Sequence, residues 1–167
     1  MVMYPRILQS YMMNYLREIL SNGYLHLDEI IYILFCENDK FYVGHTTNFE
    51  SRLKYGHFGK ISNRNLFLRL NPPLDLLFFI RTGITWQDNV NIHDFEDYVT
   101  VLISKKYGAE NVFGGFRHIK KFDKRVKFVE EYDYSANMKI INLIDPMIDF
   151  ELPEIFEIKK KYRLNKS

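Results

Sequence analysis

The chain has 167 residues, of which 47% are hydrophobic and 26% charged, and its formal net charge at pH 7 is +2. This length and composition indicate one folded domain with room for an extra element or two, and they exclude an intrinsically disordered protein. The nearly even charge balance gives no general case for a nucleic-acid partner. Any basic surface must therefore come from local clusters of Lys and Arg.

The single cysteine, Cys36, excludes a disulfide within the chain and a cysteine-rich zinc site. It stands in an apolar run, where we favour a buried small hydrophobe over a catalytic thiol. We expect no signal peptide at residues 1–10, and no run approaches the roughly 20 apolar residues that span a bilayer. These features predict a soluble, intracellular protein, in the cytoplasm or the nucleus of a host cell, without a membrane partner.

The predicted elements begin with an amphipathic helix over residues 5–20, whose apolar stripe is either a packing face or a contact for a partner. A β-hairpin comes next, with strands at 30–36 (IIYILFC) and 41–44 (FYVG) joined by a polar turn. Thr47 and Glu50 have the spacing of a capping box, which predicts that a helix begins there.

A third strand is predicted over residues 74–81 (LDLLFFIR), after one or two helical turns in 62–70. Its nearly continuous apolar content favours a central position in the sheet. Residues 91–107 form the clearest helix, which Asn91 or Asp94 caps and Gly108 ends. The order of these elements predicts an α+β fold.

The C-terminal third of the chain opens on its densest basic stretch, residues 117–127, which holds six Lys or Arg and one acid. Beyond residue 130 the mixture of aromatic, Ile and charged residues predicts an appended, partly helical element. We therefore divide the chain into an N-terminal helical extension (1–26), a central domain (27–118) and a basic, aromatic C-terminal extension (119–167).

Three short motifs of the central domain resemble those of a known family. Ile30-Ile31-Tyr32, Tyr42-Val43-Gly44 and Phe49-Glu50-x-Arg52 are similar to the core of the GIY-YIG endonucleases, with Ile30 in place of the family's first glycine. The family has a small three-stranded antiparallel sheet flanked by helices, and the predicted elements come in the same order. Glu96, on the helix after the third strand, and Asn111, in the next loop, extend the resemblance.

The resemblance implies a metal-dependent endonuclease that hydrolyses DNA phosphodiester bonds. Glu96 would hold Mg²⁺ or Mn²⁺, Arg52 would grip the phosphate, and Tyr32 would help to deprotonate the attacking water. Tyr42 would donate to a phosphate oxygen, and Asn111 would hold the site together or touch the phosphate. The hairpin suits this arrangement, because Tyr32 and Tyr42 share a face in any antiparallel register whose residue pairs have an even sum.

The family also places a histidine or tyrosine one helical turn after the arginine, where this chain has Gly56 flanked by Tyr55 and His57. We favour His57 as a proton shuttle, brought inward by an inserted residue or a widened helix end, over a structural or solvent-facing role. His45 is either a phosphate contact or a capping or surface residue.

The implied partner is DNA, double-stranded or branched. The residues predicted to contact it are His45, Lys54, Arg117, Lys120, Lys121 and Lys124. A catalytically inactive module of the same fold, which binds nucleic acid or another protein, is the alternative function. The abundant Ile, Asn, Lys, Tyr and Phe indicate an AT-rich genome, such as that of a large DNA virus or a low-GC microbe.

Overall fold

The computed structural model describes residues 29–82, 91–116, 121–144 and 152–166. The helix predicted over residues 5–20 lies outside these ranges. The described elements are, in chain order, β1 (Ile30–Cys36), η1 (Glu37–Asp39), β2 (Lys40–Thr46), α2 (Phe49–Ser51), η2 (Arg52–His57), η3 (Ile61–Asn63), α3 (Leu66–Leu70), β3 (Pro73–Arg81), α4 (Ile92–Tyr107), η4 (Ala109–Asn111), β4 (Val112–Gly114), α5 (Phe122–Glu130), η5 (Ser135–Asn137), α6 (Met138–Ile144) and α7 (Ile155–Lys166). No helix among these residues is long and apolar enough to cross a membrane.

The elements form an α+β fold around one sheet whose strand order is β3-β1-β2-β4. The α+β class and the predicted hairpin are confirmed, since β1 pairs antiparallel with β2 and also with β3. The expected number of three strands is wrong, because β4 adds a fourth strand that runs parallel to β2. β4 has only three residues, which is too short to show an alternating pattern in the sequence.

The central position predicted for β3 is also wrong. β1 has paired neighbours on both sides, whereas β3 pairs with β1 alone among the described residues. Every residue of β1 is buried, because its odd-numbered side chains pack on one face of the sheet and its even-numbered side chains on the other. Both strands are rich in apolar residues, but the run of β1 is uninterrupted, whereas β3 contains Asp75 and Arg81.

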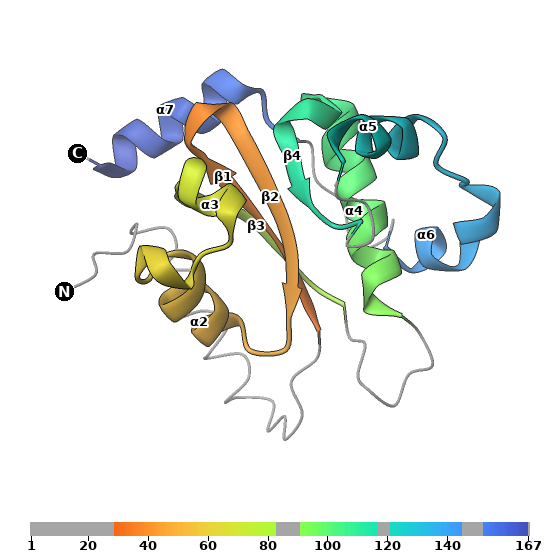
Figure 1. Cartoon of the computed structure of the whole chain (residues 1–167), viewed down its shortest axis with the longest axis horizontal. Helices are drawn as coiled ribbons and strands as arrows, with labels where there is room; N and C mark the ends of the chain where they lie inside the picture. Colours follow the sequence, from red (N-terminus) through yellow and green to blue (C-terminus); the bar gives the residue numbers. More distant parts are fainter. Residues whose placement is uncertain (1–28, 83–90, 117–120, 145–151, 167) are drawn as a thin grey trace.

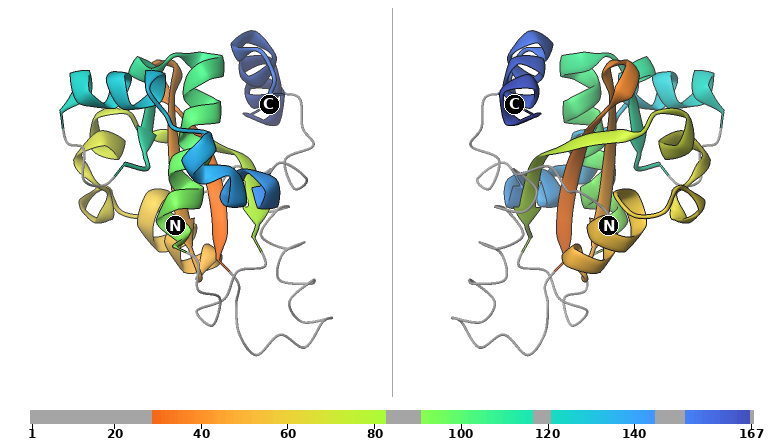
Figure 2. Two further views of the ribbon diagram at one scale, coloured as in Figure 1. Left: turned by 90° about the vertical axis from the view of Figure 1, so that its right-hand side faces the viewer. Right: turned by 90° about the vertical axis from the view of Figure 1, so that its left-hand side faces the viewer.

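Helices cover both faces of the sheet (Figures 1 and 2). The short helices α2 and α3, with the turn η2 between them, pack on the face that carries Tyr32. The long helix α4 covers the opposite face, and the core on that side continues into α5, α6 and α7. The C-terminal segment is thus partly helical, as predicted, and its apolar residues join the core beneath the sheet.

The caps of the two helices nearest the site decide where each helix begins. Asn91 caps α4, since its Oδ1 accepts the N–H of His93 at 3.0 Å, and Gly108 ends the helix as predicted. The capping box predicted at Thr47 is wrong. Asn48 is the N-cap of α2 and accepts the N–H of Ser51 at 3.1 Å, because Thr46 Oγ1 takes the N–H of Asn48 and shifts the cap by one residue.

The last residue of β4 gives a prediction about stability. Gly114 has φ +84, and a Cβ at this position would lie 1.7 Å from the carbonyl oxygen of Val43 on the paired strand. Gly114→Ala therefore has to separate β4 from β2, and we expect it to lower the free energy of unfolding by about 2 to 4 kcal/mol. Urea unfolding followed by circular dichroism measures this loss.

The control is Gly56→Ala, because a Cβ at Gly56 meets nothing nearer than Arg52 Cδ at 3.8 Å. It should change the free energy of unfolding by less than about 1 kcal/mol. Equal effects of the two substitutions would contradict the close approach of β4 to β2.

Candidate active site

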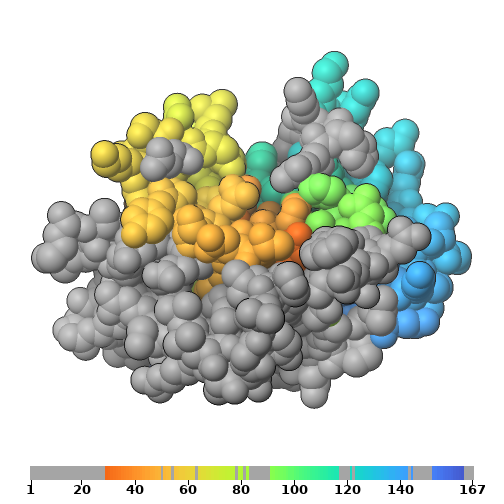
Figure 3. Space-filling model, turned by 90° about the horizontal axis from the view of Figure 1, so that it is seen from below, coloured from red at the N-terminus to blue at the C-terminus, as the bar shows by residue number. Residues whose placement is uncertain are grey.

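A pocket of about 100 Å³ lies at the edge of β2, at the end of its pairing with β4. Its lining joins residues of the hairpin and η2 with residues of α4 and the loop after β4. These residues are Tyr32, Tyr42, Gly44, His45, Arg52, Glu96, Gly114 and Gly115. Seen from below, the surface is hollowed between the yellow region of η3 and α3 and the teal region of β4 and α5 (Figure 3).

Tyr32 reaches this pocket by crossing the backbone of β2. Its cross-strand partner is Gly44, and the register pairs residues of even sum, so Tyr32 and Tyr42 lie on the same face as predicted. A Cβ added at Gly44 would lie 2.4 Å from Tyr32 Oη and 2.5 Å from Cζ. Glycine is therefore needed at position 44 because the phenol lies directly over it.

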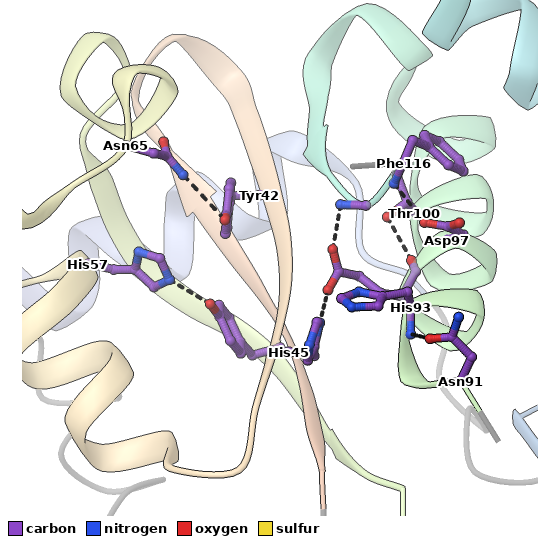
Figure 4. Close-up of polar contacts among 12 residues, drawn as sticks. Tyr42, His45, His57, Asn65, Asn91, His93, Asp97, Thr100 and Phe116 are labelled. Carbon is purple, nitrogen blue, oxygen red and sulfur yellow. Dashed lines mark hydrogen bonds and ion pairs between the residues drawn. The ribbon is translucent and has the colours of Figure 1, made fainter. Parts of the chain in front are cut away.

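His57 reaches Tyr32 because the helix widens after Arg52. The N–H of Phe58 donates to the carbonyl of Leu53, five residues earlier, which makes η2 a π-helical turn. This extra residue in the turn directs His57 inward, and its Nε2 lies 2.5 Å from Tyr32 Oη (Figure 4). Tyr55, the other residue considered at this position, is 61% exposed.

Burial sets the protonation states of this pair. Desolvation, together with the positive charges of Arg52 and Arg64, lowers the pKa of His57 to about 3. Desolvation also raises the pKa of Tyr32 well above its ordinary value, and the negative charge of Glu96 acts in the same direction. At neutral pH the pair is therefore a neutral imidazole beside a protonated phenol.

Glu96 approaches the pocket from the other face of the sheet, on α4. Glu96 is buried, with 5% of the residue exposed. Its Oε1 accepts the N–H of Gly115 at 2.7 Å, and its Oε2 contacts Nδ1 of His45. The ring of His45 in turn lies against the ring of His93, with centroids 4.7 Å apart (Figure 4).

The loop after β4 holds Glu96 in this orientation. Gly114, Gly115 and Phe116 all have positive φ, and a Cβ on Gly115 would lie 2.4 Å from Thr100 Oγ1. The buried Arg125 of α5 donates to the carbonyls of Gly114 and Gly115, at 2.6 and 3.4 Å. This tight turn directs the N–H of Gly115 at the carboxylate of α4.

Two further polar groups face the pocket from the hairpin side. Arg52 is exposed on η2 and lines the pocket. The hydroxyl of Tyr42 accepts a hydrogen bond from Nδ2 of Asn65 at 3.3 Å, and its ring centroid lies 5.2 Å from that of His57. The pocket therefore combines a cation, a carboxylate and two phenols.

Asn111 is not brought into this pocket. Its Nδ2 donates to the carbonyl of Tyr107 at 2.7 Å, and its Oδ1 accepts from Lys40 Nζ at 2.7 Å. These contacts tie the end of α4 to the start of β2, so Asn111 lies apart from the pocket that the other predicted catalytic residues approach.

The residues predicted to bind DNA do not gather in one place among the described residues. His45 lines the pocket beside Glu96, while Lys121 and Lys124 are exposed at the start of α5. Arg117 and Lys120 lie outside the described residues, as does the side chain of Lys54. Arg125 belongs to the same basic run, yet it is buried, so the run is not a uniform solvated face.

The sequence motifs did not identify His93, and they left two roles open for Cys36. The spacing of His93 and Glu96, three residues apart on a predicted helix, indicates a shared face and could have identified His93. Cys36 is fully buried, and desolvation raises its pKa to about 12, so it is a buried small residue and not a reactive thiol.

The protonation state of His57 gives a prediction about stability and pH. The imidazole has a pKa near 6.5 when unfolded and about 3 when folded, so the unfolded chain binds more protons between these values. The stability that depends on the neutral His57 is therefore fully present above pH 6.5 and is lost progressively as the pH falls toward 3. Between pH 7 and pH 5 the wild type should lose about 2 kcal/mol more than His57→Gln, as measured by urea unfolding. Parallel losses would contradict a buried neutral imidazole.

Comparison with known proteins agrees with the geometry of the site. Residues 29–107, from β1 to the end of α4, match the family model described as the GIY-YIG catalytic domain. Searches of curated proteins and of solved structures found no match. The matched segment contains Tyr32, Tyr42, Arg52 and Glu96, which the fold brings to one pocket. Residues 29–107 of this chain therefore belong to the GIY-YIG family of nucleases.

Proposed function

We propose that the protein is a metal-dependent endonuclease that hydrolyses phosphodiester bonds of DNA in this pocket. One observation carries the proposal: Tyr32, Tyr42, Arg52 and Glu96 come from three separate segments and line one small pocket. These groups suit phosphodiester hydrolysis, because attack by water adds negative charge to a phosphate that already carries one, and a cation and hydrogen-bond donors stabilise that charge.

Arg52 is the candidate for binding the phosphate. Its exposed guanidinium offers donors in a planar fork that matches two phosphate oxygens. Tyr42 would donate to the phosphate from the same side, and the amide of Asn65, which donates to its oxygen, supports this position of the phenol. Both groups would stabilise the charge that develops on the phosphate.

Tyr32 and His57 are the candidates for moving the proton of the attacking water. With the proton of His57 on Nδ1, its Nε2 accepts the phenol hydrogen and leaves lone pairs of Tyr32 Oη to accept from water. The low pKa of His57 opposes proton transfer in the free protein. A phosphate bound at Arg52 would offset the positive charges that lower this pKa, so the relay would become effective when substrate binds.

Glu96 fits the metal that this chemistry requires. Its carboxylate is buried at the pocket wall, and the N–H of Gly115 fixes one oxygen while the other faces His45. A hard divalent cation such as Mg²⁺ or Mn²⁺ is commonly held by one carboxylate and water at phosphate sites. When bound, the cation would supply positive charge beside the phosphate.

Plasmid cleavage tests the proposal. Wild type should nick supercoiled plasmid or cut branched DNA in Mg²⁺ or Mn²⁺, and Arg52→Ala and Glu96→Gln should each lower the rate by at least about 100-fold, because each removes charge stabilisation. Arg163→Ala is the matched control. This exposed arginine of α7 lines a different pocket, and its loss should leave the rate within about twofold.

The alternative is an inactive module that keeps the fold and binds nucleic acid or protein. Gel-shift binding of the same substrates by wild type, with no cleavage in either metal, would favour this alternative. Retained binding by Glu96→Gln together with lost cleavage would favour catalysis.

Gly44 provides a second test, which addresses the position of the phenol. Gly44→Ala places a methyl group 2.4 Å from Tyr32 Oη and 2.5 Å from Cζ, which forces the buried ring to shift, so the cleavage rate should fall at least about 10-fold. In a Tyr32→Phe background the same substitution should lower the cleavage rate little further, since the hydroxyl that it displaces is already absent, even though the methyl group still meets Cζ of the ring. Additive losses in the double variant would mean that Gly44 acts through another group.

A further inference from the structure

Two histidines lie beside the carboxylate that the proposed function assigns to the metal. His45 of β2, His93 of α4 and Glu96 each offer a ligand atom, and these three atoms lie within 4.8 Å of one another. His93 and Glu96 are three residues apart on α4 and therefore share a face of the helix. The sequence motifs assign neither histidine to a metal.

The spacing of these atoms suits one ion. Nitrogen and oxygen ligands at about 2.1 Å from an ion lie about 3.0 to 3.4 Å from each other in octahedral or tetrahedral geometry. Ligand atoms no more than 4.8 Å apart reach that spacing through side-chain movements of about 1 to 2 Å. His45 and Glu96 are already in direct contact through Nδ1 and Oε2.

The surroundings hold this cluster in place. The N–H of Gly115 fixes Oε1 of Glu96, which leaves Oε2 directed at His45. Contacts of this kind, made to a ligand by a neighbouring group, orient metal ligands and tune their affinity. His45 and Glu96 both line the pocket that contains Arg52 and Tyr32, so an ion held here would border the same space as the substrate phosphate.

We propose that His45, His93 and Glu96 form a three-ligand site for a first-row transition dication, such as Mn²⁺, Co²⁺ or Zn²⁺, in preference to Mg²⁺. Imidazole nitrogens favour transition ions, whereas Mg²⁺ prefers oxygen ligands and retains its water. The inference deepens the proposed function, because it assigns the ligands and the class of ion that the nuclease would use. Metal binding can nevertheless be measured without any cleavage.

Calorimetric titration of the metal-stripped full chain with MnCl₂, CoCl₂ and MgCl₂ tests the site. Mn²⁺ and Co²⁺ should bind at least about 100-fold more tightly than Mg²⁺. His45→Gln and His93→Gln should each weaken Mn²⁺ and Co²⁺ binding by about 10- to 100-fold and should leave Mg²⁺ binding within about threefold. The Co²⁺ complex should show visible absorption bands that shift in both variants.

His57→Gln is the matched control for these two variants. It removes a histidine from the hydrogen bond with Tyr32 and not from the cluster, so the affinities for all three ions should stay within about threefold. Circular dichroism of each variant excludes loss of folding as the cause of a weaker titration.

The outcomes separate this inference from the proposed function. Unchanged Mn²⁺ and Co²⁺ affinities in both variants would overturn the three-ligand site and leave His45 as a hydrogen-bond partner of Glu96, even if wild type cleaves DNA with Mg²⁺. The expected loss of affinity would support the site even if no DNA is cut, and in that case only the proposed nuclease activity would fail.

Discussion

The candidate site depends on where β4 stops pairing with β2. The parallel ladder ends at Val43 and Gly114, and the chain then turns away from the sheet through consecutive residues with positive φ. Beyond that point no strand of the described residues pairs with this edge of β2, at Gly44 and His45. The phenol of Tyr32 crosses over Gly44 from one face, and Glu96 meets His45 from the other. A longer β4 would separate the two halves of the site.

The sequence predicted the part of the site that follows from local regularities. Alternation along strands placed Tyr32 and Tyr42 on one face, and helical periodicity placed Glu96 on a helix that begins and ends near the expected residues. The sequence could not decide whether His57 points toward the site, since a regular helix places Gly56, and not His57, one turn after Arg52. One backbone hydrogen bond, from the N–H of Phe58 to the carbonyl of Leu53, widens the turn and brings His57 inward.

The other misses involve contacts between segments far apart in the chain. β4 is too short to produce a pattern, and its pairing with β2 depends on the whole crossover through β3 and α4. Arg125 stands among exposed lysines in a basic run, so nothing in the sequence distinguishes it as the residue that turns inward to the carbonyls of Gly114 and Gly115. β1 and β3 are both largely apolar, although Asp75 and Arg81 interrupt β3, and β1 is central because it pairs on both sides.

The family match ends at the last residue of α4, but the chain that builds the site continues beyond it. The carboxylate of Glu96 is bonded by the N–H of Gly115, and the loop that contains Gly115 is held by the buried guanidinium of Arg125 on α5. Burial lowers the pKa of Arg125, while the carboxylates of Asp97 and Glu96 oppose that shift, so the cation and the acids of the site stabilise one another. The C-terminal segment therefore contributes to the candidate site, because the loop that bonds the carboxylate of Glu96 is held by a residue 18 positions past the matched segment.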